Sequence, residues 1–164
     1  MKAISMCKIR YPAIEGRHYT NQGIAWIGLC LALAIHVTDE AVTDFLSVYN
    51  PAVLALRQRL PLLPLPTFTY EVWLAGLILA VTILLLLSPF AFRGVWWMKW
   101  LSYVFGALMT GNGLLHIVGS FYLRRLMPGV YSSPLLLTAA IYLMFCTHRH
   151  QWQASLLHSS ADKR

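Results

Sequence analysis

Charged residues are scarce in this sequence, and their scarcity decides the class of protein. Only 12% of the 164 residues are charged, whereas 58% are hydrophobic. A soluble domain usually carries about 25% charged residues and cannot bury this much apolar surface at this size. We therefore expect a protein whose outer surface faces lipid.

Cysteines are also few, and none of them suggests a disulfide. Cys7 precedes the first long apolar segment, while Cys30 and Cys146 lie inside apolar segments. Neither a disulfide framework nor a CxxC metal site is expected. The sequence also lacks an internal repeat, a glycine-rich phosphate loop and a low-complexity tract, so we treat it as one domain.

Acidic residues are outnumbered by basic ones, which gives the chain a net charge of +7. The lysines and arginines stand at the ends of apolar segments rather than in one groove-sized patch. Such charges set the orientation of a membrane protein, and we expect no nucleic-acid partner.

Four long stretches contain no Asp, Glu, Lys or Arg: residues 18–38, 72–92, 100–123 and 126–148. As a helix, each is long enough to cross the roughly 30 Å of hydrocarbon in a bilayer. The predicted fold is therefore all-α, an integral membrane four-helix bundle. Its organisation would be an N-terminal leader (1–18), a four-span transmembrane domain (19–148) and a C-terminal tail (149–164).

The first stretch has a second interpretation. Its apolar run ends in Ala32-Leu33-Ala34, an A-x-A pattern that is typical of a cleaved secretory signal. The uncharged stretch continues to Thr38 behind a long polar leader, and this favours a retained first span.

The basic residues predict the orientation of the spans. Nine of the 13 fall on the side of the two termini, and the other four are Arg57, Arg59, Arg124 and Arg125. By the positive-inside rule, both termini are cytoplasmic. We expect a multi-pass protein of the plasma (inner) membrane.

The connection between the first two spans has a helical beginning and a proline-rich end. Apolar residues at helical spacing predict that the first helix extends past the membrane edge to about Tyr49. Pro61, Pro64 and Pro66 then predict an extended connector over the external face.

Ionisable residues gather at the end of the first span. His36, Asp39, Glu40 and Asp44 are spaced i, i+3, i+4 and i+8, which places them within roughly a 140° arc of one helix, facing the same cavity. An ionisable side chain in hydrocarbon costs several kcal/mol unless it faces water, a partner or the bundle interior. Residues at this depth are therefore functional candidates.

The third span carries a second polar pair, Asn112 and His116, one helical turn apart. The first and third spans run in the same direction, and His36 and His116 each lie in the last quarter of their uncharged stretch. We therefore expect the two histidines at a similar depth near the external leaflet. Glycines that would allow close helix packing surround the pair: Gly106, Gly111, Gly113 and Gly119.

These residues suit either metal-dependent or metal-free chemistry. Imidazole and carboxylate ligands in a helical bundle bind zinc, iron or manganese, and the candidate ligands are His36, Glu40 and His116. Without a metal, Glu40 and His36 would serve as an acid and base pair.

Three further residues join the list of candidate catalytic residues, namely Asp39, Asn112 and Arg124. Arg124 and Arg125 open the turn between the third and fourth spans, where they would anchor the turn, reach the acidic cluster or bind an anionic head group. The participation of Asp44 and Arg125 stays open.

The candidates follow one another in the order His36-Val-Thr-Asp39-Glu40, then Asn112-x-x-x-His116, then Arg124-x-x-x-Pro128-Gly129. This pattern resembles the HXXEE domain proteins, a family of small bacterial membrane proteins, over roughly residues 20–140. The resemblance implies an enzyme of unassigned activity, whose site residues correspond to His36, Glu40, Asn112 and His116. Asp39 stands where the family has its first glutamate, so its side chain is one methylene shorter.

The leading hypothesis is a membrane-embedded enzyme that acts on a lipid or other apolar small molecule near the external leaflet. Hydrolase, isomerase and oxidoreductase activities all stay open. An alternative is a small transport or proton-relay component, which would need a homo-oligomer because four spans make a small carrier. A third hypothesis is an accessory subunit in which the polar cluster is structural.

Overall fold

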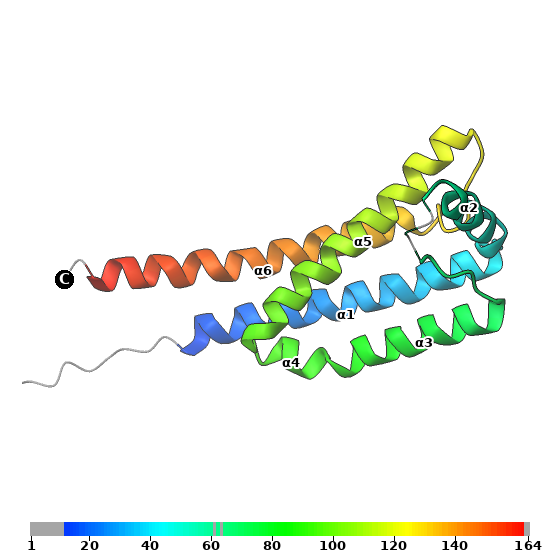
Figure 1. Cartoon of the computed structure of the whole chain (residues 1–164). Helices are drawn as coiled ribbons and strands as arrows, with labels where there is room; N and C mark the ends of the chain where they lie inside the picture. Colours follow the sequence, from blue (N-terminus) through cyan, green and yellow to red (C-terminus); the bar gives the residue numbers. More distant parts are fainter. Residues whose placement is uncertain (1–11, 61, 63, 163–164) are drawn as a thin grey trace, which may run out of the picture.

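The computed structural model describes residues 12–162 apart from residues 61 and 63, and it describes the side chains of residues 19–149 with the same gaps. Within this part of the chain all regular secondary structure is helical, as predicted (Figure 1). The helices are α1 (Pro12–Val42), α2 (Leu46–Arg59), α3 (Tyr70–Leu86), α4 (Ser88–Phe92), α5 (Trp96–Leu123) and α6 (Ser133–Asp162).

The long helices α1, α3 and α6 lie side by side, and α5 crosses them at an angle (Figure 1). α5 packs on α6, α6 packs on α1, and α1 packs on both α3 and α4. One end of the molecule holds α4, the start of α1 and the end of α6, whereas the other end holds α2 and the turn after α5. We call these the α4 end and the α2 end.

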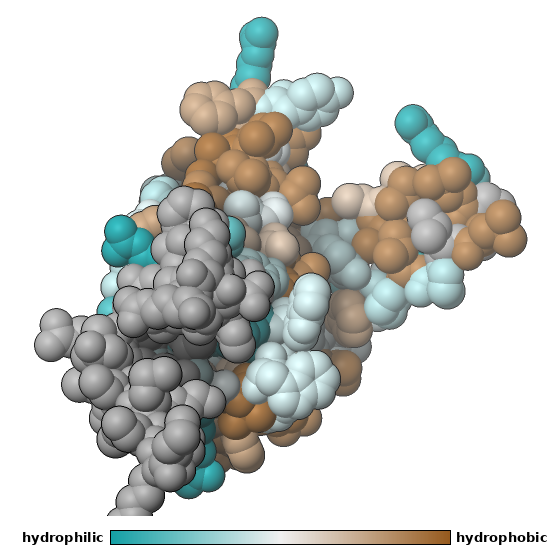
Figure 2. Space-filling model, turned by 90° about the vertical axis from the view of Figure 1, so that its left-hand side faces the viewer, coloured by the Kyte–Doolittle hydropathy of each residue, from teal (hydrophilic) through white to brown (hydrophobic). Residues whose placement is uncertain are grey.

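Three helical segments are long and apolar enough to cross a membrane: Tyr19–Val42, Tyr70–Phe92 and Trp96–Leu123. Hydrophobic side chains also cover much of the surface that is visible from the α4 end (Figure 2). Together these features indicate a membrane protein, because an exposed apolar surface of this size is stable in lipid and not in water. That α6 is a fourth span stays a prediction, since its side chains are described only as far as Arg149.

The core is apolar and lies where α1 meets α5 and α6. Its fully buried side chains are Trp26, Leu29 and Cys30 of α1, Ala91 of α4, Met98 of α5, and Leu136, Ala140 and Leu143 of α6. The indole N–H of Trp26 donates to the carbonyl oxygen of Leu84 in α3 at 2.9 Å, and its ring centroid lies 5.2 Å from that of Phe105 in α5. Trp26 therefore joins three helices while its one polar atom is hydrogen-bonded.

Two glycines let α5 approach α6 closely. A Cβ atom added at Gly106 would lie 2.6 Å from Cγ of Met144, and one added at Gly113 would lie 3.3 Å from the carbonyl oxygen of Ser133. The predicted close packing is confirmed at these two positions. Gly111, by contrast, has open space where its side chain would be.

The first helix ends earlier than predicted. α1 stops at Val42 rather than near Tyr49, and Asp44 has a positive φ of 57°. A left-handed residue cannot continue a right-handed helix. Phe45 then stacks on Trp73 of α3 at a centroid distance of 5.8 Å. The prediction was wrong because the apolar residues keep a helical spacing in the sequence even where the chain turns. Phe45 in that turn packs on α3 instead of continuing the first helix.

α2 is a separate helix in a region where the sequence predicts only a helix end and a connector. The side-chain amide of Asn50 donates to the carbonyl oxygen of Phe68 at 3.0 Å and accepts from its N–H at 3.1 Å. These two bonds hold α2 against the connector. The proline-rich connector is confirmed where it is described, since residues 64–69 have no regular secondary structure.

Several other predicted boundaries also shift. The second span is interrupted after Leu86, and Pro89 lies in the first turn of α4, where its missing N–H leaves no hydrogen bond unmade. The helix of the predicted fourth span begins only at Ser133, so residues 126–132 form a turn. Residues 1–11 of the predicted leader lie outside the described residues, and α6 continues through the predicted tail to Asp162.

Replacing Gly106 by leucine should destabilise the protein in detergent, because the new side chain would have to displace Met144. Overpacking of this kind costs about 1–3 kcal/mol, and we expect an apparent Tm that is lower by several degrees in thermal unfolding. Gly111→Leu is the matched control in the same helix, since nothing lies within 4 Å of its added Cβ atom. Equal Tm values for the two variants would contradict the close α5–α6 contact.

Candidate functional site

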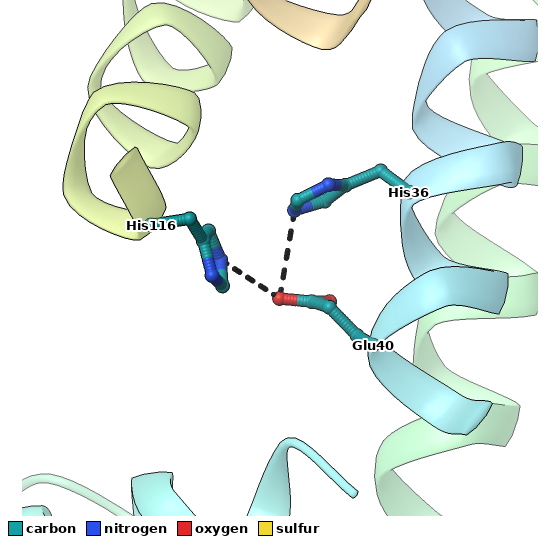
Figure 3. A group of neighbouring side chains, drawn as sticks. All are labelled: His36, Glu40 and His116. Atoms are coloured by element: carbon teal, nitrogen blue, oxygen red, sulfur yellow. Dashed lines mark ion pairs between the residues drawn. The ribbon is translucent and has the colours of Figure 1, made fainter. Parts of the chain in front are cut away.

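Three ionisable side chains meet near the α2 end, between α1 and α5 (Figure 3). Oε1 of Glu40 lies 3.1 Å from Nε2 of His116 and 3.6 Å from Nε2 of His36. The two histidines lie at a similar depth, as predicted, and their rings are in contact, with centroids 4.9 Å apart in an edge-on arrangement. We call His36, Glu40 and His116 the His–Glu cluster.

The His–Glu cluster is almost fully buried. The exposed fractions are 0% for His36, 6% for Glu40 and 3% for His116. One ligand atom from each residue lies within 4.8 Å of the other two, so the cluster could hold a metal ion. Ligand atoms around a tetrahedral zinc ion are separated by about 3.3 Å. The two distances to Oε1 of Glu40 lie on either side of this value.

Hydrogen bonds indicate which nitrogen of His36 carries the proton. Oγ of Ser132 lies 2.7 Å from Oδ2 of Asp39 and 2.8 Å from Nδ1 of His36. The hydroxyl has one hydrogen, which it donates to the ionised carboxylate, so Nδ1–H of His36 must donate to Ser132. The amide of Asn112 donates to Nε2 of His36 at 3.1 Å, which agrees with this assignment. In this assignment the unprotonated Nε2 accepts from Asn112 and lies 3.6 Å from Oε1 of Glu40.

Asp39 acts on the cluster through Ser132 rather than directly. Its Oδ2 accepts from the backbone N–H of Ser132 at 2.9 Å as well as from the hydroxyl. A carboxylate at this place also suits the start of α6, where backbone N–H groups are free and the helix dipole is positive. Asp39 thus positions His36 and the first turn of α6 together. The expectation that it would face the same cavity as His36 and Glu40 is corrected to this indirect role.

The turn between α5 and α6 covers the cluster with its backbone. Gly129 has a positive φ of 82°, and an added Cβ atom would lie 2.9 Å from Cγ of Glu40 and 3.0 Å from Cε1 of each histidine. Its N–H donates to Oγ1 of Thr43 at 3.3 Å. Glycine is needed here for two reasons, the left-handed conformation and the close approach to the cluster.

His116 is held from its other side by aromatic packing. The ring centroid of Phe45 lies 5.8 Å from that of His116. Nδ1 of His116 is buried and has no hydrogen-bond partner among the described residues. A neutral ring that donates Nε2–H to Glu40 fits these contacts, because only a lone pair is then left on Nδ1.

The other predicted residues lie outside the cluster. Asp44 is exposed in the turn after α1, and Arg124 and Arg125 are exposed after α5. No hydrogen bond or ion pair joins these three side chains to the cluster in the part of the chain that is described. Asp44 does not share the face of His36 because the helix ends before it.

Two residues of the site, Ser132 and Gly129, were not predicted. The sequence signals were present, since Pro128-Gly129 and Ser132-Ser133-Pro134 are typical of a turn and a helix start. They indicated local structure only. This turn folds back over His36 and Glu40 because of two long-range contacts. Ser132 bonds to Asp39, 93 positions earlier in the chain, and to His36, 96 positions earlier.

A family model described as a protein of unknown function with an HXXEE motif matches residues 26–143. The match covers well over half of the chain. The chain belongs to this HXXEE family. Comparison with curated proteins and with solved structures found no match.

In this HXXEE protein the motif lies on the last two turns of α1. Its first and last residues, His36 and Glu40, belong to the His–Glu cluster. Asp39, at the position of the first glutamate, instead holds the start of α6. The motif therefore places two cluster residues and one positioning carboxylate on neighbouring faces of one helix.

Ser132→Ala should destabilise the HXXEE protein, because Nδ1–H of His36 and Oδ2 of Asp39 would each lose a partner. A buried polar group without a partner costs about 1–3 kcal/mol, which thermal unfolding in detergent can measure. Thr138→Ala is the control, since this exposed hydroxyl of α6 donates only to the carbonyl oxygen of Pro134. If Ser132→Ala were as stable as Thr138→Ala, the hydrogen-bonded chain from Asp39 to His36 would be refuted.

Proposed function

We propose that this HXXEE protein is a membrane-embedded enzyme that acts on a lipid or other apolar small molecule. His36, Glu40 and His116 would bind a divalent metal ion, namely zinc, iron or manganese. Asp39 would position His36 through Ser132, and Asn112, whose amide nitrogen lies 3.1 Å from Nε2 of His36, would lie beside the bound ion. Arg124 lies apart from the cluster and receives no catalytic role in this proposal.

One observation carries the proposal: three buried ligand atoms, one each from His36, Glu40 and His116, lie within 4.8 Å of one another. When Nδ1–H of His36 donates to Ser132, the lone pair of Nε2 accepts from Asn112 and lies 3.6 Å from Oε1 of Glu40, and a metal ion would replace the bond to Asn112. A carboxylate in such a place costs several kcal/mol unless a cation neutralises it. A divalent ion between the two atoms removes this cost, and His116 supplies a third ligand.

The surroundings of His36 support the same conclusion. Histidines that bind metals usually donate their second N–H to a carboxylate, a carbonyl or water, which fixes the ring and raises its basicity. His36 donates its Nδ1–H to Ser132, and the hydroxyl of Ser132 donates to the carboxylate of Asp39. A bound ion would supply a Lewis acid that polarises a carbonyl or phosphoryl oxygen of the substrate. Three protein ligands leave coordination positions for water and substrate.

The depth of the cluster supports an apolar substrate. Glu40 lies near the end of the candidate span Tyr19–Val42, and His116 lies seven residues before the end of Trp96–Leu123. A molecule dissolved in the bilayer reaches this level without entering water. We further propose that α6 is the fourth span and that both termini are cytoplasmic in a plasma (inner) membrane, as nine of the 13 basic residues favour.

A metal-free acid and base is the second candidate, and one contact favours it. Nδ1 of His116 lacks the hydrogen-bond partner that a metal-binding histidine usually has. In that case His116 and Glu40, 3.1 Å apart, would exchange a proton with the substrate.

A proton pathway finds less support, because it requires polar groups along the full depth of the membrane. At the α4 end, Gln22 donates to Ser102 at 3.2 Å, and both side chains are buried. Most of the buried groups between this pair and the cluster are hydrophobic, namely those of Trp26, Leu29, Cys30, Leu33, Leu136 and Ala140, although the hydroxyl of Thr110 is also buried without a hydrogen-bond partner among the described residues. The described residues therefore favour a one-sided site over a channel.

Elemental analysis of the protein, purified in detergent without chelators, tests the metal site. We expect about one zinc, iron or manganese ion per chain, as the three-ligand cluster predicts. His36→Ala and His116→Ala should each lower the metal content at least about tenfold, because each removes a ligand. His148→Ala is the matched control, since this exposed histidine of α6 is not one of the three clustered ligands, and the metal content of this variant should be unchanged.

Thermal unfolding of the same samples shows which variants are folded. Metal that persists in both folded cluster variants would exclude the His–Glu cluster as its site. Absence of metal from the wild type would overturn the metal-dependent mechanism and leave acid and base chemistry, for which Glu40→Gln is the next variant.

A further inference from the structure

A pocket of about 330 Å³ opens at the α2 end, beside the last turns of α5 and the turn that follows. Its volume lies at the lower end of the roughly 300–1,000 Å³ that small-molecule pockets have. Apolar side chains form most of the wall, namely Ile117, Phe121, Leu126 and Val130. Its polar lining comes from Ser120 and from two consecutive arginines, Arg124 and Arg125.

The two arginines carry positive charge that no carboxylate balances nearby. Where side chains are described, the ion pairs are those of Glu40 with the two histidines, so neither arginine has an acidic partner. Their guanidinium groups are suited to bidentate binding of a phosphate. The pocket therefore combines an anion-binding rim with an apolar wall.

The backbone at Arg124 is also unusual. Arg124 ends α5 with φ of 50° and ψ of 34°, a left-handed conformation that glycine or asparagine usually adopts after a helix. An arginine is unfavourable in this conformation, so local structure alone does not account for the choice of residue. The position of Arg124 on the pocket rim gives a reason for an arginine here.

The depth of the pocket indicates where the anion comes from. The candidate span Trp96–Leu123 ends directly before the two arginines, which places them at the level of the head groups. Phe121 is 80% exposed and Leu126 is 65% exposed, and both point to contact with acyl chains. The geometry points to a binding site for an anionic phospholipid, with its phosphate on Arg124 and Arg125 and its acyl chains along the apolar wall.

The pocket and the His–Glu cluster share a wall. Oγ of Ser120 donates to the carbonyl oxygen of His116 at 2.7 Å and accepts from the N–H of Met127 at 2.9 Å. Val130 lines the pocket, and its neighbour Gly129 covers the cluster. We infer that phospholipids of this kind are also the substrate class of the enzyme, and this inference rests on the proposed function. The inference that a phospholipid binds in the pocket does not rest on the proposed function.

Lipid titration followed by native mass spectrometry tests the binding. The detergent-purified full chain is titrated with phosphatidylglycerol, with phosphatidylcholine and with inorganic phosphate. The wild type should bind phosphatidylglycerol at least about tenfold more tightly than phosphatidylcholine, and Arg124→Gln/Arg125→Gln should lose this preference. Arg57→Gln/Arg59→Gln removes the same amount of charge from exposed or half-buried positions on α2. This variant should keep the preference for phosphatidylglycerol.

Equal loss in the two double variants would overturn the proposal, because the preference would then follow total charge. Release of the lipid by millimolar inorganic phosphate would overturn it in favour of a free-anion site. If Arg124→Gln/Arg125→Gln does not fold, Arg125→Gln alone is used, with an expected loss of about threefold. His116→Ala should keep the lipid preference while it loses metal, so failure of the lipid site and failure of the proposed function are distinguishable.

Discussion

The burial of one carboxylate, Glu40, is the constraint on which the rest of the site depends. Its Oε1 lies between Nε2 of His36 and Nε2 of His116, with almost no access to water. An unpaired charge cannot persist there, so α1 and α5 must meet where the histidine of one reaches the carboxylate of the other. The small residues of α5 allow α6 to close against the same helix pair at this level.

The turn before α6 completes the site by contributing backbone and hydroxyl groups instead of charge. Gly129 brings the main chain within contact of all three cluster residues, and Ser132 accepts from Nδ1–H of His36 and donates to Asp39. Asp39 in turn stabilises the start of α6. Fold and site are therefore supported by the same hydrogen bonds, and positions that orient the cluster also determine where a helix begins.

The two ends of the molecule differ in chemistry because the apolar core between them keeps polar groups apart. The α4 end holds the hydrogen bond between Gln22 and Ser102, whereas the α2 end holds the His–Glu cluster and the arginine-lined pocket. Three segments suited to a membrane join these ends. A site near one end of the candidate spans, beside the two arginines of the pocket, fits the proposed amphiphilic substrate that stays in its leaflet.

The sequence by itself predicted the helical class, the apolar surface of a membrane protein, and the similar depth of His36 and His116, because helical rise fixes the depth of each residue along a span. It also placed Glu40 one turn from His36. Only the tertiary structure decided that the first helix ends at Val42, that Asp39 turns to Ser132, and that Gly129 covers the cluster. These features arise from contacts between distant parts of the chain, which residue spacing within one helix does not encode.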